Sequence, residues 1–356
     1  MGTACSGTDS VIKVLEHIGR SSGWTFTHEF SCECHPVKQA WVRENFPELP
    51  IIFSDICALH TGRAVNTITG EQLAVPAVDL FVTGFVCKSV STENVQREQH
   101  ASCITDGSGK TGATFEGLRQ YVEGCRPRLV ICENVSGLLK RARGCEAQIH
   151  HVRKAFEDLG YAFGHTLVDA RNFLLPQRRT RVWMWAIRAD ASAAPAAAQV
   201  ATILADLQQK EPVPLDGFLS AVAGDCQQRQ SVNEREESAL AAVLTNNRPL
   251  QRLSEEELQD LVVDISKSCG RAPWCLGAAP CVLPGSRLYW RRKQWVLGAR
   301  EMAALQGIWC RDFPALQSWC EDPHRSRILM DMAGNAFTST ICIAVVLAVM
   351  VAISPC

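Results

Sequence analysis

Short apolar runs, each ending at a polar residue or a glycine, alternate with helical periodicity along the first half of the chain. Runs of about four to eight β-branched and aromatic residues predict buried strands, and apolar residues spaced three and four apart predict helices. The predicted strands are residues 1–5, 25–32, 51–54, 80–83, 129–132 and 162–168. The predicted helices are residues 11–19, 37–46, 114–124 and 146–159. This alternation predicts an α/β fold with a mostly parallel sheet flanked by helices.

The predicted strand 80–83 leads to a candidate nucleophile, Cys87. The chain there reads Asp79-Leu-Phe-Val-Thr-Gly-Phe-Val-Cys-Lys-Ser-Val-Ser91. Gly84 allows a turn where a Cβ would clash, so the thiol lies on the loop beyond the carboxyl end of the strand. Open α/β sheets hold their sites at this edge. The alternative is a structural thiol, because cysteine packs well as a small apolar side chain.

Three carboxylates come directly after predicted strands: Glu33, Asp55 and Glu133. Glu33 lies 26 positions after Gly7, close to the offset of about 20 at which an acid reaches ribose hydroxyls in nucleotide-binding folds. We expect Glu133 to be desolvated, which would raise its pKa. The alternative for each acid is a solvated loop carboxylate.

The segment Leu175-Pro-Gln-Arg-Arg-Thr-Arg-Val-Trp-Met-Trp185 places Arg179 and Arg181 two residues apart. On a strand, such side chains share a face. Two cations on one face, beside Trp183 and Trp185, could hold an oxygen or a phosphate of a substrate. The alternative is a solvated basic edge strand.

Gly7 lies in the predicted turn between the first strand and the first helix. Backbone N–H groups of such turns meet nucleotide-like cofactors. Asp9 or Ser10 as a simple helix N-cap is the alternative. Only residues 1–5 are available for the first strand, so we expect the chain to begin inside the domain.

Composition restricts the choice of partner and compartment. The formal net charge of −1 gives no overall attraction to nucleic acid, so binding would need a local basic stripe. The 17 cysteines include no Cys-x2-Cys pair, and we expect no metal site, including at Cys32-Glu-Cys-His35. No signal peptide precedes the first motif, so we expect reduced thiols and a location in the nucleus or cytoplasm.

Later segments are less regular. The alanine-rich residues 190–202 predict a linker, and residues 190–285 hold 7 Lys and Arg against 13 Asp and Glu, the wrong sign for a phosphate-binding face. Residues 254–264 predict an acidic amphipathic helix with a capping box.

Cations interleaved with aromatics at 287–295 suit stacking and phosphate contact, with a solvated turn as the alternative. The run 341–353 is too short to span a bilayer, so we expect a buried terminal helix and no membrane association.

Taken together, these motifs resemble the S-adenosylmethionine-dependent cytosine-C5 DNA methyltransferases. The matching segments, in the family's order, are Gly7, Glu33-Cys-His-Pro36, Asp55-Ile56, Gly84-Phe-x-Cys87, Glu133-Asn-Val135, Gln177-x-Arg-x-Arg181, Arg300-Glu…Leu-Gln-Gly307 and Gly334-Asn335. Two positions depart from the pattern: Val86 replaces a proline and Lys88 replaces a glutamine. A proline would fix the backbone φ, and a lysine facing the sulfur would lower the thiol pKa.

The resemblance implies a Rossmann-like catalytic domain, residues 1–188 plus 297–356, and a small target-recognition region, residues 189–296, across a cleft. It implies S-adenosylmethionine as the cofactor and a mobile substrate-covering loop within the polar segment 92–112. The cofactor contacts that it implies are Cys5, Ser6, Gly7, Thr8, Glu33, Cys34, Asp55, Ile56 and Asn335.

The implied chemistry is addition of the Cys87 thiolate to C6 of a cytosine flipped out of DNA. Glu133 would bond to N3 of the base while protonated, and Arg181, with Arg179, would hold its O2. We expect a monomer. Two alternatives stay open: a tRNA cytosine-C5 methyltransferase, suggested by the acidic region, and an inactive nucleic-acid-binding relative, suggested by Val86, Lys88 and the altered cofactor loop.

Overall fold

The computed structural model describes residues 1–142, 144–189, 192–209, 211–222, 231–268 and 270–354. The chain forms two compact units. The first comprises Met1–Val168, Thr180–Gln208 and Ile341–Cys356, and the second comprises Asp169–Arg179 and Gln209–Thr340. The predicted domains, 1–188 plus 297–356 and 189–296, divide the chain differently: residues 169–179 and 297–340 fall within the second unit, and residues 189–208 within the first.

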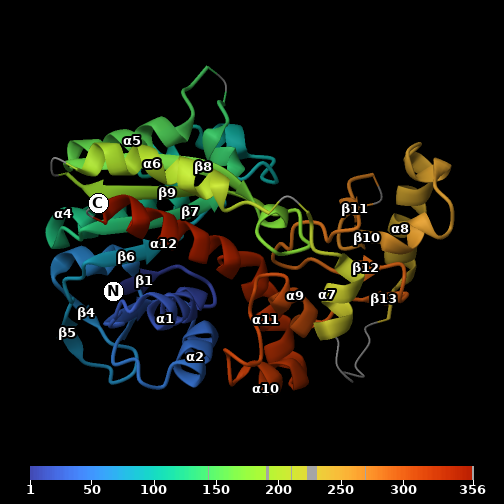
Figure 1. Ribbon diagram of the computed structural model, residues 1–356, viewed down its shortest axis with the longest axis horizontal. Coiled ribbons are helices and arrows are strands. Elements are labelled where there is room, and N and C mark those ends of the chain that lie inside the picture. The colour runs from blue at the N-terminus through green and yellow to red at the C-terminus, as the bar shows by residue number, and fades with distance from the viewer. Residues whose placement is uncertain (143, 190–191, 210, 223–230, 269, 355–356) are drawn as a thin grey trace. The chain divides into compact units, whose positions relative to one another are not determined.

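The first unit is built on a seven-stranded sheet with the strand order β3-β2-β1-β6-β7-β9-β8 (Figure 1). Its strands are β1 (Gly2–Ala4), β2 (Phe30–Cys32), β3 (Ile52–Phe53), β6 (Leu80–Thr83), β7 (Leu129–Val135), β8 (Tyr161–Asp169) and β9 (Thr180–Arg188). The first five in spatial order run parallel, and β9 is antiparallel to β7. The predicted mostly parallel α/β fold is confirmed. A separate hairpin joins β4 (Arg63–Val65) and β5 (Gln72–Ala74).

The strand order reverses between β1 and β6. From β1 the chain builds outward to β2 and β3, and it then returns to place β6 on the other side of β1. The Gly84 N–H, just beyond β6, donates to the Ala4 carbonyl at the end of β1 (3.2 Å). The carboxyl ends of these strands therefore meet at a topological switch point, where open α/β sheets bind their ligands.

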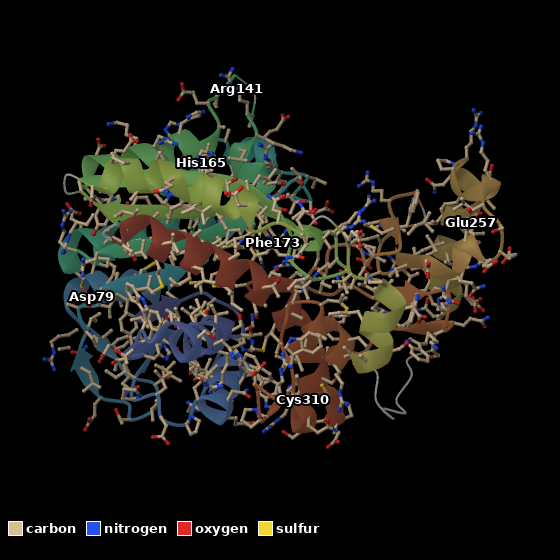
Figure 2. The ribbon with its side chains drawn as sticks, viewed as in Figure 1. Asp79, Arg141, His165, Phe173, Glu257 and Cys310 are labelled. Carbon is tan, nitrogen blue, oxygen red and sulfur yellow. The ribbon has the colours of Figure 1, made fainter. Side chains whose placement is uncertain are left out.

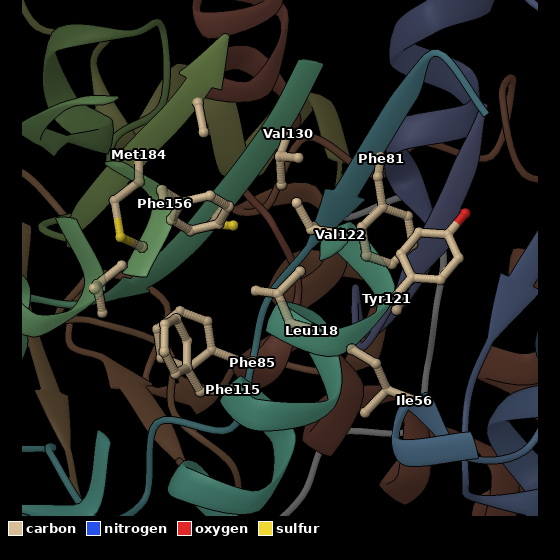
Figure 3. Close-up of a cluster of buried hydrophobic side chains, with 14 of the residues drawn as sticks. Ile56, Phe81, Phe85, Phe115, Leu118, Tyr121, Val122, Val130, Phe156 and Met184 are labelled. Atoms are coloured by element: carbon tan, nitrogen blue, oxygen red, sulfur yellow. The ribbon is translucent and has the colours of Figure 1, made fainter. Parts of the chain in front are cut away.

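Two helices cover one face of this sheet. The helices of the unit are α1 (Ser10–Ser22), α2 (Pro36–Asn45), α3 (Cys103–Asp106), α4 (Gly109–Cys125), α5 (Gln148–Asp158) and α6 (Ala193–Asp206), followed much later by α12 (Ser339–Ile353). Apolar side chains of α4 and α5 pack with those of β6, β7 and β9 in one buried cluster (Figure 3). The cluster includes Phe81, Phe115, Leu118, Tyr121, Val122, Val130, Phe156 and Met184. Spacings of three and four along α4 place its members on one helical face.

The helix α6 covers the other face of the sheet at β9. Met184 points into the α4–α5 cluster, so its neighbour Trp185 points to the opposite side of β9. There the Trp185 indole N–H donates to the Ala197 carbonyl of α6 (2.9 Å). The predicted linker over 190–202 is therefore wrong where the structure describes it, since alanine, the strongest helix former, forms α6 instead. Residues 190 and 191 lie outside the described residues.

The apolar C-terminal run forms α12, and most of its side chains are buried, as predicted, although Val351 near its end is 59% exposed. Ile341, Cys342, Val345 and Val346 have no exposed surface. By length and composition alone, one stretch among the described residues, Pro323–Ile353, is long and apolar enough to cross a membrane, and its most apolar window has a mean hydropathy of 2.6. Because 67% of its most apolar window is buried within the structure, and core helices share this composition, the finding is weak evidence for a membrane span.

The second unit contains a four-stranded antiparallel sheet with the order β11-β10-β12-β13. Its strands are β10 (Leu261–Asp264), β11 (Trp274–Leu276), β12 (Leu288–Trp290) and β13 (Trp295–Val296). Its helices are α7 (Leu215–Val222), α8 (Glu234–Asn246), α9 (Ala299–Ala304), α10 (Leu316–Glu321) and α11 (Pro323–Asn335).

The predicted helix over residues 254–264 is wrong. The capping box forms, with the Ser254 N–H donating to Glu257 Oε2 (2.7 Å) and the Glu257 N–H donating to Ser254 Oγ (3.2 Å). It caps only a 3₁₀ turn, Glu257–Asp260, and the chain then enters β10. Val262 and Val263 point into two separate apolar clusters. Burial on both faces favours a strand over a helix with one polar side.

Candidate active site

Cys87 lies on a tight turn just after β6. We call residues 84–91 the cysteine loop. The Cys87 carbonyl accepts hydrogen bonds from the N–H groups of Val90 (3.1 Å) and Ser91 (3.0 Å), which closes the turn. Cys87 is half-buried, and Lys88 is exposed to solvent. The predicted effect of Lys88 on the thiol pKa stays a prediction.

Side chains from β7 and α4 hold the backbone of the cysteine loop. The three bonds are Asn134 Nδ2 to the Phe85 carbonyl (2.9 Å), the Val86 N–H to Thr114 Oγ1 (3.1 Å) and the Ser89 N–H to Thr111 Oγ1 (3.0 Å). Phe85 is buried and its ring packs edge-on against Phe115 of α4, with the ring centroids 5.2 Å apart. The loop is thereby fixed on both sides of the thiol.

The turn after β7 also lies against the cysteine loop. A Cβ at Gly137 would lie 1.9 Å from the Val90 carbonyl oxygen, so only glycine fits here. Arg97 donates to the carbonyls of Gly137 (3.2 Å), Lys140 (2.6 Å) and Arg141 (3.4 Å). Figure 2 labels Arg141, at the tip of the segment that leads from β7 to α5. The polar segment 92–112, predicted as a loop, therefore contains anchored structure, including a 3₁₀ turn, Arg97–His100, and the helix α3.

Glu133 and Arg181 form an ion pair across two neighbouring strands. The Arg181 Nε lies 3.2 Å from Glu133 Oε1, and the two side chains are only 9% and 12% exposed. Arg181 pairs in register with Val135, two residues beyond Glu133, so both side chains are on the same face of the sheet. Burial, with a smaller contribution from the Glu133 carboxylate, raises the pKa of the Cys342 thiol on α12 to about 12. For Glu133 itself, burial favours the protonated form and Arg181 favours the ionised form, so its predicted rise in pKa stays a prediction.

Arg179 does not share a strand face with Arg181, contrary to the prediction. The strand β9 begins at Thr180, and Arg179 is 1% exposed. Its guanidinium donates to the carbonyls of Val282 (2.8 Å), Gly334 (3.2 Å) and Ala336 (2.7 Å). These bonds join segments of the second unit, so the geometry of Arg179 is that of a structural residue.

Gln177 has a similar structural position in the second unit. Its Nε2 donates to the Leu305 carbonyl (2.6 Å), and its Oε1 accepts from the Val282 N–H (3.0 Å) and from Gln306 Nε2 (3.2 Å). Three of the motifs found in the sequence, 177–181, 300–307 and 334–335, are thus held together by the buried hydrogen bonds of Gln177 and Arg179.

The candidate cofactor loop, residues 5–9, joins β1 to α1. Cys5 and Asp9 have positive φ angles of 51° and 55°, and Gly7 has 77°. The Asp9 carboxylate accepts hydrogen bonds from the hydroxyls of Ser6 and Ser31. Asp9 is the N-cap residue of α1, as in the alternative, but its side chain makes no capping hydrogen bond to the helix. Instead, Asp9 ties the loop to β2.

The predicted acids lie at the next two strand ends. Glu33 follows β2 and Asp55 follows β3, beside the cofactor loop in the strand order. Burial raises the pKa of the Cys5 thiol strongly, and the charges of Glu33 and Asp55 add to the rise. Both carboxylates therefore lie near Cys5. Glu33 Oε1 accepts from the His35 N–H (2.8 Å), and Asp55 Oδ1 accepts from the Cys57 N–H (2.9 Å).

The remaining predicted cofactor residues have different environments. Ser6, Gly7 and Thr8 are buried in the loop, and Ile56 is buried after Asp55, whereas Cys34 is exposed. Asn335 belongs to the second unit, where it is exposed and its Nδ2 donates to the Asp331 carbonyl (3.1 Å). Across the described ranges, no group of three or more His, Cys, Asp or Glu side chains is arranged to hold a metal ion.

The basic segment at 287–295 is paired with acids of its own unit. The ion pairs are Arg287–Glu236, Arg291–Glu255 (2.7 Å) and Arg292–Asp260 (2.8 Å). Lys293 lies over the ring of Trp290, 5.9 Å from its centroid. Trp290 has no exposed surface, so it is not a stacking platform in this structure.

Sequence reasoning missed four residues around the cysteine loop: Thr111, Thr114, Asn134 and Gly137. The sequence did carry a signal for Asn134, because this residue follows Glu133 in a matched motif. The threonines carry no signal, since a hydroxyl on a helix is ordinary until the loop that it holds is known.

Comparison with known proteins identifies the family. The model of the C-5 cytosine-specific DNA methylases matches residues 14–268. A DNA (cytosine-5-)-methyltransferase DMT5 of Cryptococcus neoformans is 33% identical over 227 residues, 62% of this chain and 9% of that protein. The Type II methyltransferase M2.BsuMI of Bacillus subtilis is 30% identical over 156 residues, 44% of this chain and 35% of that protein.

Solved structures share the fold at low sequence identity. The S. pombe Dnmt2 methyltransferase has a TM-score of 0.56 at 13% identity, covering 98% of this chain and 97% of that chain. The Entamoeba histolytica methyltransferase EhMeth has a TM-score of 0.57 at 10% identity, and the match covers 99% of this chain and 98% of that chain. The chain spans about a tenth of the length of the DMT5 relatives, at 9% and 10%. Because the family model covers well over half of its residues, this chain belongs to the C-5 cytosine-specific DNA methylase family.

Proposed function

We propose that this chain catalyses S-adenosylmethionine-dependent methylation of cytosine C5 in DNA, with Cys87 as the nucleophile. One observation carries the proposal. The buried Glu133–Arg181 pair lies near the carboxyl end of β7, and Asn134, the residue after Glu133, binds the cysteine loop two residues before the thiol. A thiol, a carboxyl group and a guanidinium at one sheet edge are the groups that addition to a cytosine ring requires.

Cys87 supplies the covalent step. Its thiolate adds to C6, forming an S–C6 bond and moving the C5=C6 electron pair towards C5, which becomes nucleophilic. After methylation, a base removes the C5 proton, the C5=C6 bond re-forms and the S–C6 bond breaks to return the thiolate. In duplex DNA the cytosine must first leave the stack, at a cost of a few kcal/mol.

Glu133 and Arg181 act on the polar edge of the ring. Glu133, protonated or sharing a proton, donates to N3 and neutralises the charge that develops as the thiolate adds. Arg181 orients Glu133 and donates to O2 of the base. Arg179, predicted to share this task, is bound to carbonyls of the second unit, so we assign base contact to Arg181.

The first loop and its neighbours suit S-adenosylmethionine. Glu33 and Asp55 can accept from hydroxyl and amino groups, and both lie near Cys5 at the carboxyl edge of the sheet. Thr8 Oγ1 is buried and lacks a hydrogen-bond partner among the residues that the structure describes, so this hydroxyl can form a hydrogen bond with a ligand. When bound, S-adenosylmethionine would supply the methyl group as an electrophilic sulfonium. Asn335 remains a proposed contact.

The substrate is the less constrained part of the proposal. Family membership favours DNA, whereas the ion-paired arginines of residues 287–292 leave little unpaired positive charge in that segment. A tRNA substrate is the second arm of the test. We also propose a monomer that acts in the nucleus or cytoplasm, where its cysteines would stay thiols.

The test measures transfer of labelled methyl groups from S-adenosylmethionine to duplex DNA and, separately, to tRNA. The wild-type chain is compared with Cys87→Ser and with Cys145→Ser, an exposed cysteine that serves as the matched control. We expect transfer to DNA that Cys87→Ser abolishes and Cys145→Ser preserves. Transfer to tRNA alone would change the substrate, and no transfer by a folded chain that binds S-adenosylmethionine would overturn the activity.

A further inference from the structure

The amide that precedes the candidate nucleophile has a specific acceptor. The Val86 N–H donates to Thr114 Oγ1 at 3.1 Å. The Thr114 hydroxyl itself donates to the Lys110 carbonyl of the preceding helical turn (2.8 Å), so its oxygen lone pairs are available to accept. A half-buried backbone N–H needs such an acceptor, because leaving it unpaired destabilises the loop conformation.

A second threonine of the same helix holds the other side of the loop. The Ser89 N–H donates to Thr111 Oγ1 at 3.0 Å, and Thr111 has no exposed surface. Thr111 and Thr114 are three residues apart, so both hydroxyls lie on one face of α4. The two accepted amides belong to residues 86 and 89, one on each side of Cys87.

The helix that carries these hydroxyls is itself fixed. Phe115, Leu118 and Val122 of α4 are buried in the core of the first unit (Figure 3). Between the threonines, a Cβ at Gly112 would lie 2.2 Å from the Cys103 carbonyl oxygen, so the preceding segment packs directly on the helix backbone. The hydroxyls are therefore attached to a rigid support.

We propose that Thr114, assisted by Thr111, is a positioning residue for Cys87. A proline at position 86 would fix φ through its ring and would have no N–H. Valine fixes φ only weakly and adds a donor, and the Thr114 hydroxyl both accepts that donor and restrains the backbone next to the thiol. The inference rests on the proposed function in that its kinetic readout is attack of Cys87 on cytosine.

The test is a double-mutant cycle between positions 86 and 114, in the full chain. Thr114→Val keeps the shape and removes the acceptor, Thr114→Ser keeps the acceptor, and Val86→Pro removes the donor. The readout is the single-turnover rate at which the chain, in the presence of S-adenosylmethionine, forms a covalent adduct with duplex DNA containing 5-fluorocytosine, where fluorine at C5 prevents the elimination that would release Cys87. DNA affinity is measured in parallel. Thr245→Val is the matched control, because among the residues that the structure describes that hydroxyl bonds only to carbonyls of its own helix, α8.

We expect Thr114→Val to slow adduct formation about tenfold or more, with DNA affinity unchanged, and Thr114→Ser to retain the rate. In the Val86→Pro background, Thr114→Val should have almost no further effect, because no N–H is left unpaired. Two outcomes would overturn the proposal. One is that Thr114→Val lowers the rate of adduct formation equally with and without Val86→Pro. The other is that Thr114→Ser lowers that rate as much as Thr114→Val does.

A second readout separates this inference from the proposed function. The alkylation rate of Cys87 by iodoacetamide, followed by peptide mass spectrometry, needs neither DNA nor methyl transfer. We expect Thr114→Val to change this rate and Val86→Pro to suppress the change, with Thr245→Val unchanged. If the wild-type chain formed no DNA adduct, this pattern would still support the positioning of Cys87 by Thr114 while refuting the proposed attack on DNA. An alkylation rate that is the same in the wild-type chain and in Thr114→Val would refute the positioning role of Thr114.

Discussion

Arg181 on β9 pairs with Glu133 on the neighbouring strand β7, with Nε 3.2 Å from Oε1 and both side chains nearly buried. Removing one partner of such a pair leaves a buried charge without compensation, which costs about 3–5 kcal/mol. Replacing both by apolar residues of similar size is often neutral. Stability and catalysis can therefore be separated at this pair.

We predict that Glu133→Gln lowers single-turnover methyl transfer by at least about 10²-fold, because the amide cannot donate a carboxyl proton. Arg181→Met alone should lower the free energy of unfolding by about 3 kcal/mol. The double variant Glu133→Leu/Arg181→Met should regain most of that stability and stay inactive. Urea unfolding and methyl-transfer rates check both quantities; a double variant that is stable and active would remove the pair from the mechanism.

Arg179 differs from Arg181 in what its substitution should do. Its guanidinium donates to three carbonyls inside the second unit, so Arg179→Met would leave buried acceptors unpaired and cost about 3 kcal/mol or more. We predict faster amide hydrogen exchange around residues 282 and 334–336, with exchange in β6 and β7 unchanged. If Arg179→Met slowed adduct formation and left amide hydrogen exchange unaltered, Arg179 would instead be assigned to contact with the base.

The sequence predicted the central sheet well, because its strands are apolar on both faces. The strand 80–83 was predicted with the observed bounds, since Leu80 to Thr83 are all buried and Gly84 ends the run. Glu33 and Asp55 follow their strands as predicted, because a polar side chain after a buried strand marks where the chain leaves the sheet. The prediction for Glu133 is wrong in this respect: β7 does not end at Cys132 but continues through Glu133 to Val135, where it pairs with β9.

Tertiary context explains why some of the sequence-based predictions were wrong. Residues 254–264 carry a genuine helix-capping pattern, yet Val262 and Val263 are buried on opposite sides and form a strand. Arg179 follows the spacing of a strand residue, but its guanidinium is bound by carbonyls more than 100 positions later. Contacts at that sequence distance leave no local pattern, and the same holds for the hydrogen bond between Thr114 and Val86.

Gly137 should be intolerant of any side chain. A Cβ there would lie 1.9 Å from the Val90 carbonyl oxygen, and backbone cannot move aside cheaply. We predict that Gly137→Ala lowers the free energy of unfolding by about 2 kcal/mol and slows adduct formation by displacing the cysteine loop. The matched control is Gly124→Ala in α4, where nothing lies within 4 Å of the new Cβ. That change should stabilise the chain by up to about 1 kcal/mol. Equal effects of the two substitutions in thermal unfolding would contradict the close approach.

The buried thiol of Cys342 predicts how stability depends on pH. Burial and the nearby Glu133 raise its pKa from 9.0 to about 12. Below about pH 9 the thiol is protonated in both the folded and the unfolded chain, so its contribution to stability is fully present. Between about pH 9 and pH 12 the unfolded chain loses the proton and the folded chain keeps it. The free energy of unfolding should therefore fall by about 1.4 kcal/mol per pH unit from this group alone.

Urea unfolding of the wild-type chain and of Cys342→Ala, from about pH 8 to pH 11, checks this prediction. Other thiols raised by burial, including those of Cys5 and Cys132, add to the slope in both proteins, so the informative quantity is the difference. Cys342→Ala should have the shallower decline, by about 1.4 kcal/mol per pH unit above about pH 9. Cys145→Ala, at an exposed cysteine, should match the wild-type slope. Parallel curves for wild type and Cys342→Ala would mean that the Cys342 thiol ionises near its ordinary pKa, and therefore that α12 does not shield it from water in solution.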